Sequence, residues 1–125
     1  MTIKWITQAQ VKAAAEKGER AALAMSLRHW KQLAAAGEKE LRWAEQEGLT
    51  GCGFCALCER YDHDCTGCPL VDRGRPCFEY GPYSAADGAF ADWRDDPSPA
   101  RFIEWRIAAR AMRDLLQRLY DEGKK

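Results

Sequence analysis

Residues 52–77 read CGFCALCERYDHDCTGCPLVDRGRPC and contain all 6 cysteines of this 125-residue chain. Their spacing is Cys-x2-Cys-x2-Cys-x6-Cys-x2-Cys-x8-Cys, so Cys-x2-Cys pairs occur on both sides of a six-residue gap. Two residues between cysteines let both sulfurs reach one ion from a single tight turn, and two such turns complete the tetrahedron that zinc prefers in structural sites. The spacing therefore predicts a metal centre, and we expect one structural zinc ion.

The candidate ligands are Cys52, Cys55, Cys58, Cys65, Cys68 and Cys77. The most compact set of four is Cys55, Cys58, Cys65 and Cys68. Cys77 can replace one of these, and Cys52 can pair with Cys55 instead. His63, which lies between two aspartates, is a further candidate because zinc also accepts imidazole nitrogen. The spacing leaves open which four groups bind.

Other states of the cysteines are alternatives to a single zinc. Cys52, Cys55 and Cys58 imitate the first three ligands of the bacterial ferredoxin run, although the gap to the fourth is too long for that iron–sulfur motif. A two-zinc cluster that shares all 6 cysteines is another arrangement. Disulfides need an oxidising compartment. The first residues lack the apolar stretch of a secretion signal, so we expect a cytoplasmic protein with reduced cysteines.

The pattern outside the cysteines predicts a mainly helical fold, with a helical hairpin and a long C-terminal helix around a loop-rich insert that binds zinc through four cysteines. The length fits a single domain over residues 1–125. We expect a helical N-terminal part over 1–48, the metal-binding insert over 49–97 and the last helix over 98–121.

Capping residues and apolar spacing predict the first three helices. Thr7 can cap a helix over 8–17, and Leu23, Leu27, Trp30 and Ala34 recur at helical spacing within 19–36. A shorter helix over 38–47 ends at Gly48, with Leu41, Trp43 and Ala44 on its apolar face.

The last helix has the clearest pattern. Ser98 is a candidate N-cap, and Pro99 suits the first helical position. The core-facing series is Phe102, Trp105, Ala109, Met112, Leu116 and Leu119, with Ile103, Leu115 and Tyr120 broadening the stripe. We expect this helix to pack on the second helix through Trp30.

The segment between the N-terminal helices and the last helix, residues 49–97, has no helical period and is rich in Gly, Pro and Asp. This composition predicts loops that the metal orders.

The charge distribution indicates the kind of partner. The chain has 19 basic and 19 acidic residues, but residues 49–97 carry 4 of the former and 9 of the latter, a net charge of −5. Proteins that bind nucleic acid need Lys and Arg at the phosphates, so this insert favours a protein partner with a basic surface. Arg106, Arg110 and Arg113, with Tyr83 and Trp93 if these are exposed, leave nucleic acid as an alternative. No stretch is long and apolar enough to predict a membrane partner.

The sequence contains no recognisable catalytic set. It has only 2 histidines, and none of the usual phosphate loops, nucleophile elbows or zinc-protease motifs. His29, beside Trp30, is expected at the boundary of the core as a hydrogen-bonding residue. We therefore expect a protein that is not an enzyme.

Several of these residues together resemble a known group. The runs Cys55–Tyr61 and Asp64–Leu70, then Cys77 and Gly81–Tyr83, resemble small, uncharacterised cysteine-rich proteins of phages and prophages. Those proteins also carry an upstream Ser-x-x-His-Trp helix, matched by Ser26–Trp30, and Trp93 matches a later tryptophan. Here Gly81 replaces their threonine, and Cys52 is an additional cysteine, which makes it the least secure ligand. The resemblance covers about residues 20–95 and implies a phage protein in a bacterial host cell.

Together these features predict a non-enzymatic structural-zinc protein that binds and modulates a host or phage protein. An inhibitor of nucleic-acid-handling or defence machinery is the more specific form of this hypothesis. The alternatives are a nucleic-acid-binding zinc module and an iron–sulfur redox or sensor protein.

A first prediction concerns removal of the metal. Structural zinc sites supply about 10–16 kcal/mol, whereas a whole domain is stable by only about 5–15 kcal/mol. A chelator that strips the ion should therefore abolish cooperative thermal unfolding, followed by circular dichroism. An unchanged melting curve from protein proven free of metal would contradict the prediction.

Overall fold

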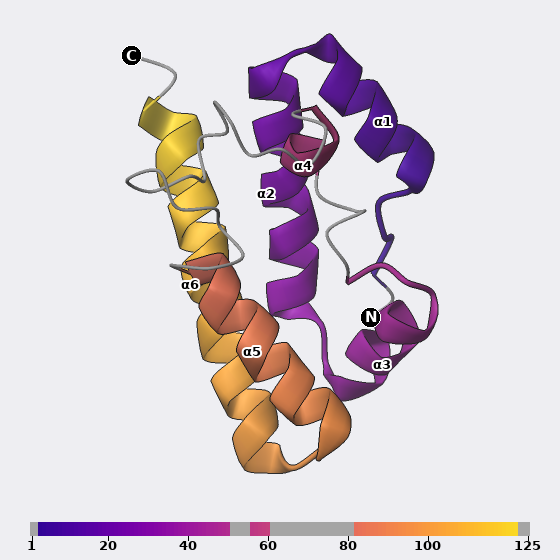
Figure 1. Ribbon diagram of the computed structural model, residues 1–125, viewed down its shortest axis with the longest axis vertical. Helices are drawn as coiled ribbons and strands as arrows, with labels where there is room; N and C mark the ends of the chain where they lie inside the picture. The colour runs from indigo at the N-terminus through magenta and orange to yellow at the C-terminus, as the bar shows by residue number, and fades with distance from the viewer. Residues whose placement is uncertain (1–2, 51–55, 61–81, 123–125) are drawn as a thin grey trace.

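The computed structural model describes residues 3–50, 56–60 and 82–122, and most of these residues are helical (Figure 1). In chain order the helices are α1 (Gln8–Lys17), α2 (Glu19–Ala35), α3 (Glu38–Gln46), α4 (Ala56–Arg60), α5 (Pro82–Asp95) and α6 (Pro99–Glu122). No strand occurs in these described ranges, so the mainly helical fold that the sequence predicts is confirmed.

Local interactions explain where the helices begin. Thr7 Oγ1 accepts a hydrogen bond from the Gln10 amide at 3.2 Å, and Gln10 Oε1 accepts one from the Thr7 amide at 2.9 Å. This reciprocal pair is a capping box at the start of α1. Ser98 Oγ accepts a hydrogen bond of 3.2 Å from the Arg101 amide and so caps the start of α6. The chain reverses between α1 and α2 at Gly18, which has φ 138° and ψ 175°. Glycine adopts this conformation without the strain that it would impose on a residue with a Cβ.

The predicted bounds of α1, α2, α3 and α6 are confirmed to within one residue, but the loops predicted over 49–97 are wrong for α4 and α5. In α5 the buried side chains of Ala86, Phe90 and Trp93 recur at spacings of four and three. Asp87 and Gly88 are exposed, and a Cβ added at Gly88 would meet no atom within 4 Å. The residues with low helix propensity therefore lie on the solvent side, and burial of the aromatic side stabilises the helix.

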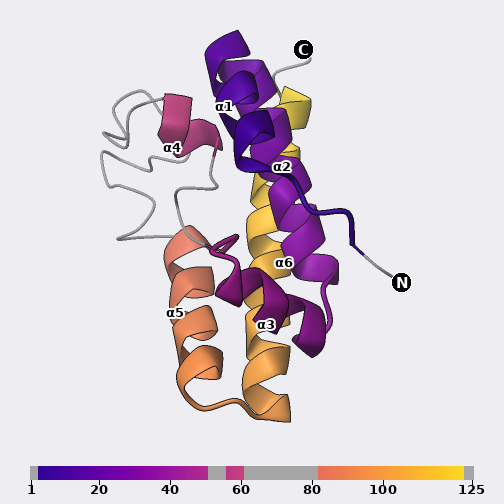
Figure 2. The ribbon, with the colours of Figure 1, turned by 90° about the vertical axis from the view of Figure 1, so that its right-hand side faces the viewer.

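Two long helices form the centre of the fold. α2 and α6 run side by side along the long axis, with α1 packed on α2 and α5 packed on α6 (Figures 1 and 2). α4 contacts both α1 and α2. α3 lies at the end of α2 where the chain turns after Ala35 (Figure 1). One apolar cluster includes residues from every one of these helices.

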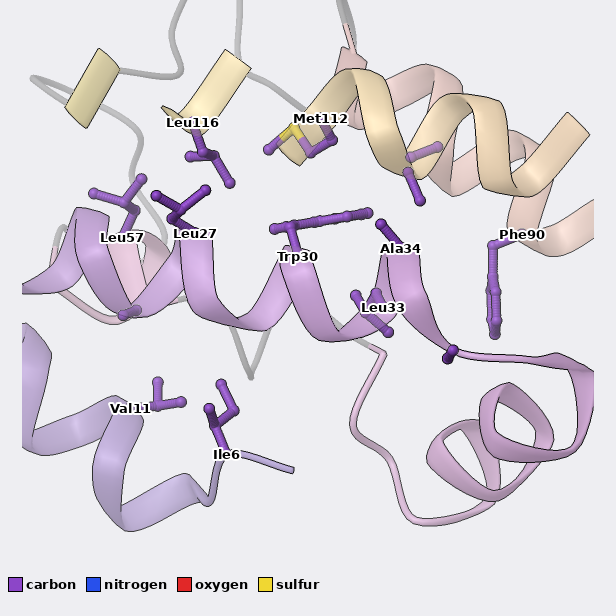
Figure 3. Close-up of a cluster of buried hydrophobic side chains, with 14 of the residues drawn as sticks. Ile6, Val11, Leu27, Trp30, Leu33, Ala34, Leu57, Phe90, Met112 and Leu116 are labelled. Carbon is purple, nitrogen blue, oxygen red and sulfur yellow. The ribbon is translucent and has the colours of Figure 1, made fainter. Parts of the chain in front are cut away.

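The side chains of this cluster interlock between α2 and α6. In the close-up, Leu27, Trp30 and Ala34 lie on the side of α2 that faces Met112 and Leu116 of α6 (Figure 3). Trp30 and Trp105 have ring centroids 6.1 Å apart, which confirms the predicted contact between the second and last helices. Aromatic contacts of this kind add to the apolar area that the rings bury.

Two residues do not follow the predicted core pattern. Ile103 was expected in the core stripe but is 58% exposed, because it lies two positions from buried Trp105 and therefore roughly 200° around the helix. Trp43 was expected on the apolar face of its helix but is 47% exposed, whereas its neighbours Leu41 and Ala44 are buried. Its ring stacks on Trp5, with centroids 6.4 Å apart.

Trp105 provides a test of the core. The substitution Trp105→Ala removes a side chain that is only 2% exposed and contacts rings of α2 and α5. It should lower the free energy of unfolding by about 3–5 kcal/mol, measured by urea denaturation. The control Ile103→Ala, on the exposed side of the same helix, should change it by less than about 0.5 kcal/mol. Similar losses for both variants would show that this packing is not the source of stability.

Candidate metal centre

The predicted ligands lie almost entirely outside the described residues. Those outside are Cys52, Cys55, Cys65, Cys68, Cys77 and His63, and of Cys58 the structure describes only the backbone, which belongs to α4. Within residues 3–50, 56–60 and 82–122, no three His, Cys, Asp or Glu side chains are grouped as a metal site would require. The described residues therefore show how the chain is held on either side of the cysteines, and the ligand set stays a prediction.

α4 is the described element closest to the cysteines, and it is firmly packed. Ala56 and Leu57, the two residues between Cys55 and Cys58, are both fully buried. At the other end of α4, Arg60 Nη1 donates a hydrogen bond of 2.9 Å to the carbonyl oxygen of Ala15. Ala15 lies in the last turn of α1, where carbonyl groups have no partner within their own helix. Arg60 therefore satisfies the end of α1 and fixes the position of α4.

Ser26 of α2 binds the first turn of α4. Its side chain is 1% exposed, and its Oγ accepts a hydrogen bond of 3.3 Å from the backbone amide of Leu57. Amides in the first turn of a helix have no partner within that helix, and a buried amide without one costs free energy. This hydroxyl supplies the missing acceptor from a different helix.

His29, one turn further along α2, binds the chain just before the cysteines. Its ring is 3% exposed, and Nε2 lies 2.7 Å from the carbonyl oxygen of Leu49. A carbonyl only accepts, so Nε2 carries the proton and donates it. Burial lowers the pKa of His29 from 6.5 to about 4, and the hydrogen bond to Leu49, which acts in the opposite direction, offsets only part of this shift. The imidazole is therefore neutral at pH 7 and more buried than the boundary position that the sequence predicts.

Trp30 contacts the chain that follows the cysteines. Its ring meets that of Tyr83, in the first turn of α5, edge to face with centroids 6.1 Å apart. We call Ser26, His29 and Trp30 the α2 platform. Through Leu49, Leu57 and Tyr83, the platform holds the chain before, within and after the stretch that carries the cysteines.

The sequence predicts that His29 forms a hydrogen bond, and this is confirmed, but it does not predict the role of Ser26. Ser26 and His29 are polar residues on the apolar face of α2, three positions apart. Buried polar groups need partners, so this placement was a signal of contacts beyond the helix. The partners Leu49 and Leu57 could not be found, because a backbone group accepts or donates whatever its side chain is.

Among the residues considered for nucleic acid, the aromatic side chains are buried or partly buried. Trp93 is 2% exposed and Tyr83 is partly buried against Trp30, so these rings do not form an open stacking surface. The guanidinium of Arg106 lies 5.8 Å from the ring centre of Phe102, and Arg113 forms an ion pair of 3.0 Å with Asp114. Arg110 is exposed.

Comparisons with family models, curated proteins and solved structures yield no match to this chain. None of the helices in the described ranges is both long and apolar enough to cross a membrane.

The pKa of His29 gives a prediction about pH. Since the pKa in the folded state lies below that of the unfolded chain, the unfolded state binds more protons between pH 6.5 and about 4. Stability from neutral His29 is therefore lost as pH falls through this window. Between about pH 7 and pH 4, the free energy of unfolding should fall by up to about 3 kcal/mol more in wild type than in His29→Gln. Urea denaturation at several pH values in this range measures the free energy of unfolding of both proteins. Groups that titrate alike in the two proteins cancel when wild type and variant are compared. Parallel pH profiles for the two proteins would refute the neutral, buried state assigned to His29.

Proposed function

We propose that this chain is a non-enzymatic protein whose cysteine-rich segment, residues 52–77, is organised by one structural zinc ion, and that it binds and modulates another protein. The resemblance to cysteine-rich phage proteins suggests a phage origin and a place in the cytoplasm of a bacterial host. On this proposal the partner is a host or phage protein, with nucleic-acid-handling or defence machinery as the class to test first.

The α2 platform is the observation that carries the proposal. Ser26 and His29 are both buried and use their polar atoms to bind backbone groups of Leu57 and Leu49. Buried polar side chains that bind the chain just before this segment and within it support a defined conformation for the segment. This arrangement suits a segment that is presented to a partner, because a rigid binding surface loses less conformational entropy on association.

The donor chemistry fits a structural zinc ion. Four of Cys52, Cys55, Cys58, Cys65, Cys68 and Cys77 would hold it, and zinc would supply a closed tetrahedral centre that fixes the thiolates in place. Cys58 of the most compact set lies within α4, an element that is already packed, and Cys55 is the residue before it in the sequence. The packing of α4 would thus reduce the entropy cost of assembling the site.

Acidic groups of α5 and of the turn after it support a partner with a basic surface. Asp87, Asp92, Asp95 and Asp96 are all exposed on α5 and on the turn after it. Arg101 lies 3.8 Å from Asp92 and 3.4 Å from Asp96, so it offsets part of this charge. Because exposed ion pairs of this kind are weak, a basic partner can compete with Arg101 for the carboxylates.

The metal content is the first test. Protein purified without added metal should contain about one zinc per chain by elemental analysis. The double variant Cys55→Ser, Cys58→Ser should lose the zinc, whereas Cys52→Ser, the matched control at the least secure position, should keep it. Absence of metal from wild type would overturn the zinc centre, and iron with visible absorption would select the iron–sulfur alternative.

Binding is tested on the same samples. Immobilised zinc-loaded protein should retain a specific protein from a bacterial host lysate, and the double variant Asp92→Lys, Asp95→Lys should not. Retention of oligonucleotides that weakens steeply as salt rises would instead favour the nucleic-acid alternative.

A further inference from the structure

A groove runs along the outer side of the α1–α2 hairpin. Its volume is about 370 Å³. It is lined by Gln10, Ala13, Ala14, Lys17, Ala21, Ala24, Met25 and Arg28. The residues from α2 lie on the opposite side of that helix from Leu23, Leu27 and Trp30, which face the core. The groove is therefore separate from the α2 platform and from the contacts of α2 with α6.

The floor of the groove suits an additional helix. Ala13, Ala14, Ala21 and Ala24 form most of it, and Met25 adds a flexible apolar side chain. Small side chains let a further helix approach closely, and methionine adapts to the shape of its neighbour. From Ala21 to Arg28 the groove follows α2 for about 10 Å, the length of two helical turns.

The charges at the rim define the partner. α1 and α2 run in opposite directions from Gly18, so Lys17 lies at the hairpin end of the groove and Arg28 lies at the other end. Neither cation pairs with an acidic side chain in the part of the chain that the structure describes, and no Asp or Glu lines the groove. Two cations at opposite ends of an apolar floor, neither with a carboxylate partner among the described residues, are complementary to an acidic amphipathic helix.

We propose that this groove binds an amphipathic helix of a partner protein, one that presents two turns of apolar side chains with a carboxylate at each end. The inference rests on the proposed function as an interaction protein and adds a second surface to it. The acidic groups of α5 favour a basic partner segment, and the groove favours an acidic one.

The test uses the zinc-loaded full chain and two synthetic peptides. The first is a fluorescein-labelled 14-residue helix with leucines at i, i+3, i+4 and i+7 and glutamates at both ends, and the second has lysines in place of the glutamates. Fluorescence anisotropy should give about tenfold tighter binding for the glutamate peptide, because two attractive pairs replace two repulsive ones. The preference should reverse in the variant Lys17→Glu, Arg28→Glu.

A second variant checks the location. Ala24→Trp fills the floor of the groove and should abolish binding of the glutamate peptide, whereas Ala111→Trp, at an exposed position of α6, should not affect it. Circular dichroism of each variant serves to check that it is folded. If Ala24→Trp does not fold, the charge-reversed variant still decides the outcome.

Three results would overturn the inference. These are equal affinity for the two peptides, no binding at all, and an Ala24→Trp protein that binds as wild type does. Sedimentation that shows a dimer converted to a monomer by Ala24→Trp would assign the groove to a second copy of the chain and would also overturn it. Failure here with zinc and lysate binding intact would leave the proposed function standing, whereas absence of zinc from the wild-type protein would overturn the proposed function and not the groove.

Discussion

The indole of Trp30 contacts rings from two other helices at once. Tyr83 of α5 and Trp105 of α6 each have their ring centroids 6.1 Å from that of Trp30. Phe90 of α5 extends the contact, at 5.4 Å from Trp105. Since α2 reaches α5 through these rings, the position where the chain re-enters the core after the cysteines depends on them. Loss of this packing would detach the first turn of α5 from α2.

Helix ends and the main core were predictable from sequence because their causes are local. Thr7 and Ser98 satisfy amides only three residues away, so the cap is visible in a short stretch. The stripe from Trp105 to Leu116 repeats at the helical period over several turns. α5 was not predicted, because Asp87, Gly88 and Asp92 interrupt a short apolar pattern whose stabilising contacts come from Trp105 and other residues far along the chain.

The candidate site divides in the same way. Cysteine spacing is a local property, so it can suggest a metal centre, which stays a prediction, but which four sulfurs would bind depends on the path of residues 52–77 in space. The α2 platform could not be predicted, since Ser26 and His29 bind backbone groups 31 and 20 residues away. The α1–α2 groove could not be predicted from the sequence either. Ala21 and Ala24 have the same helical spacing whether another part of the chain covers them or a groove is left open above them.

The central claim is that α2 holds the chain just before the cysteine-rich segment and within it through the buried polar side chains of His29 and Ser26. Native-state hydrogen exchange tests it at the amide of Leu57, which donates to Ser26 Oγ. Wild type should protect this amide, and Ser26→Ala should accelerate its exchange by about tenfold, the effect of about 1.4 kcal/mol. Amides in the middle of α6 should keep their protection. Equal exchange of the Leu57 amide in the two proteins would contradict the account.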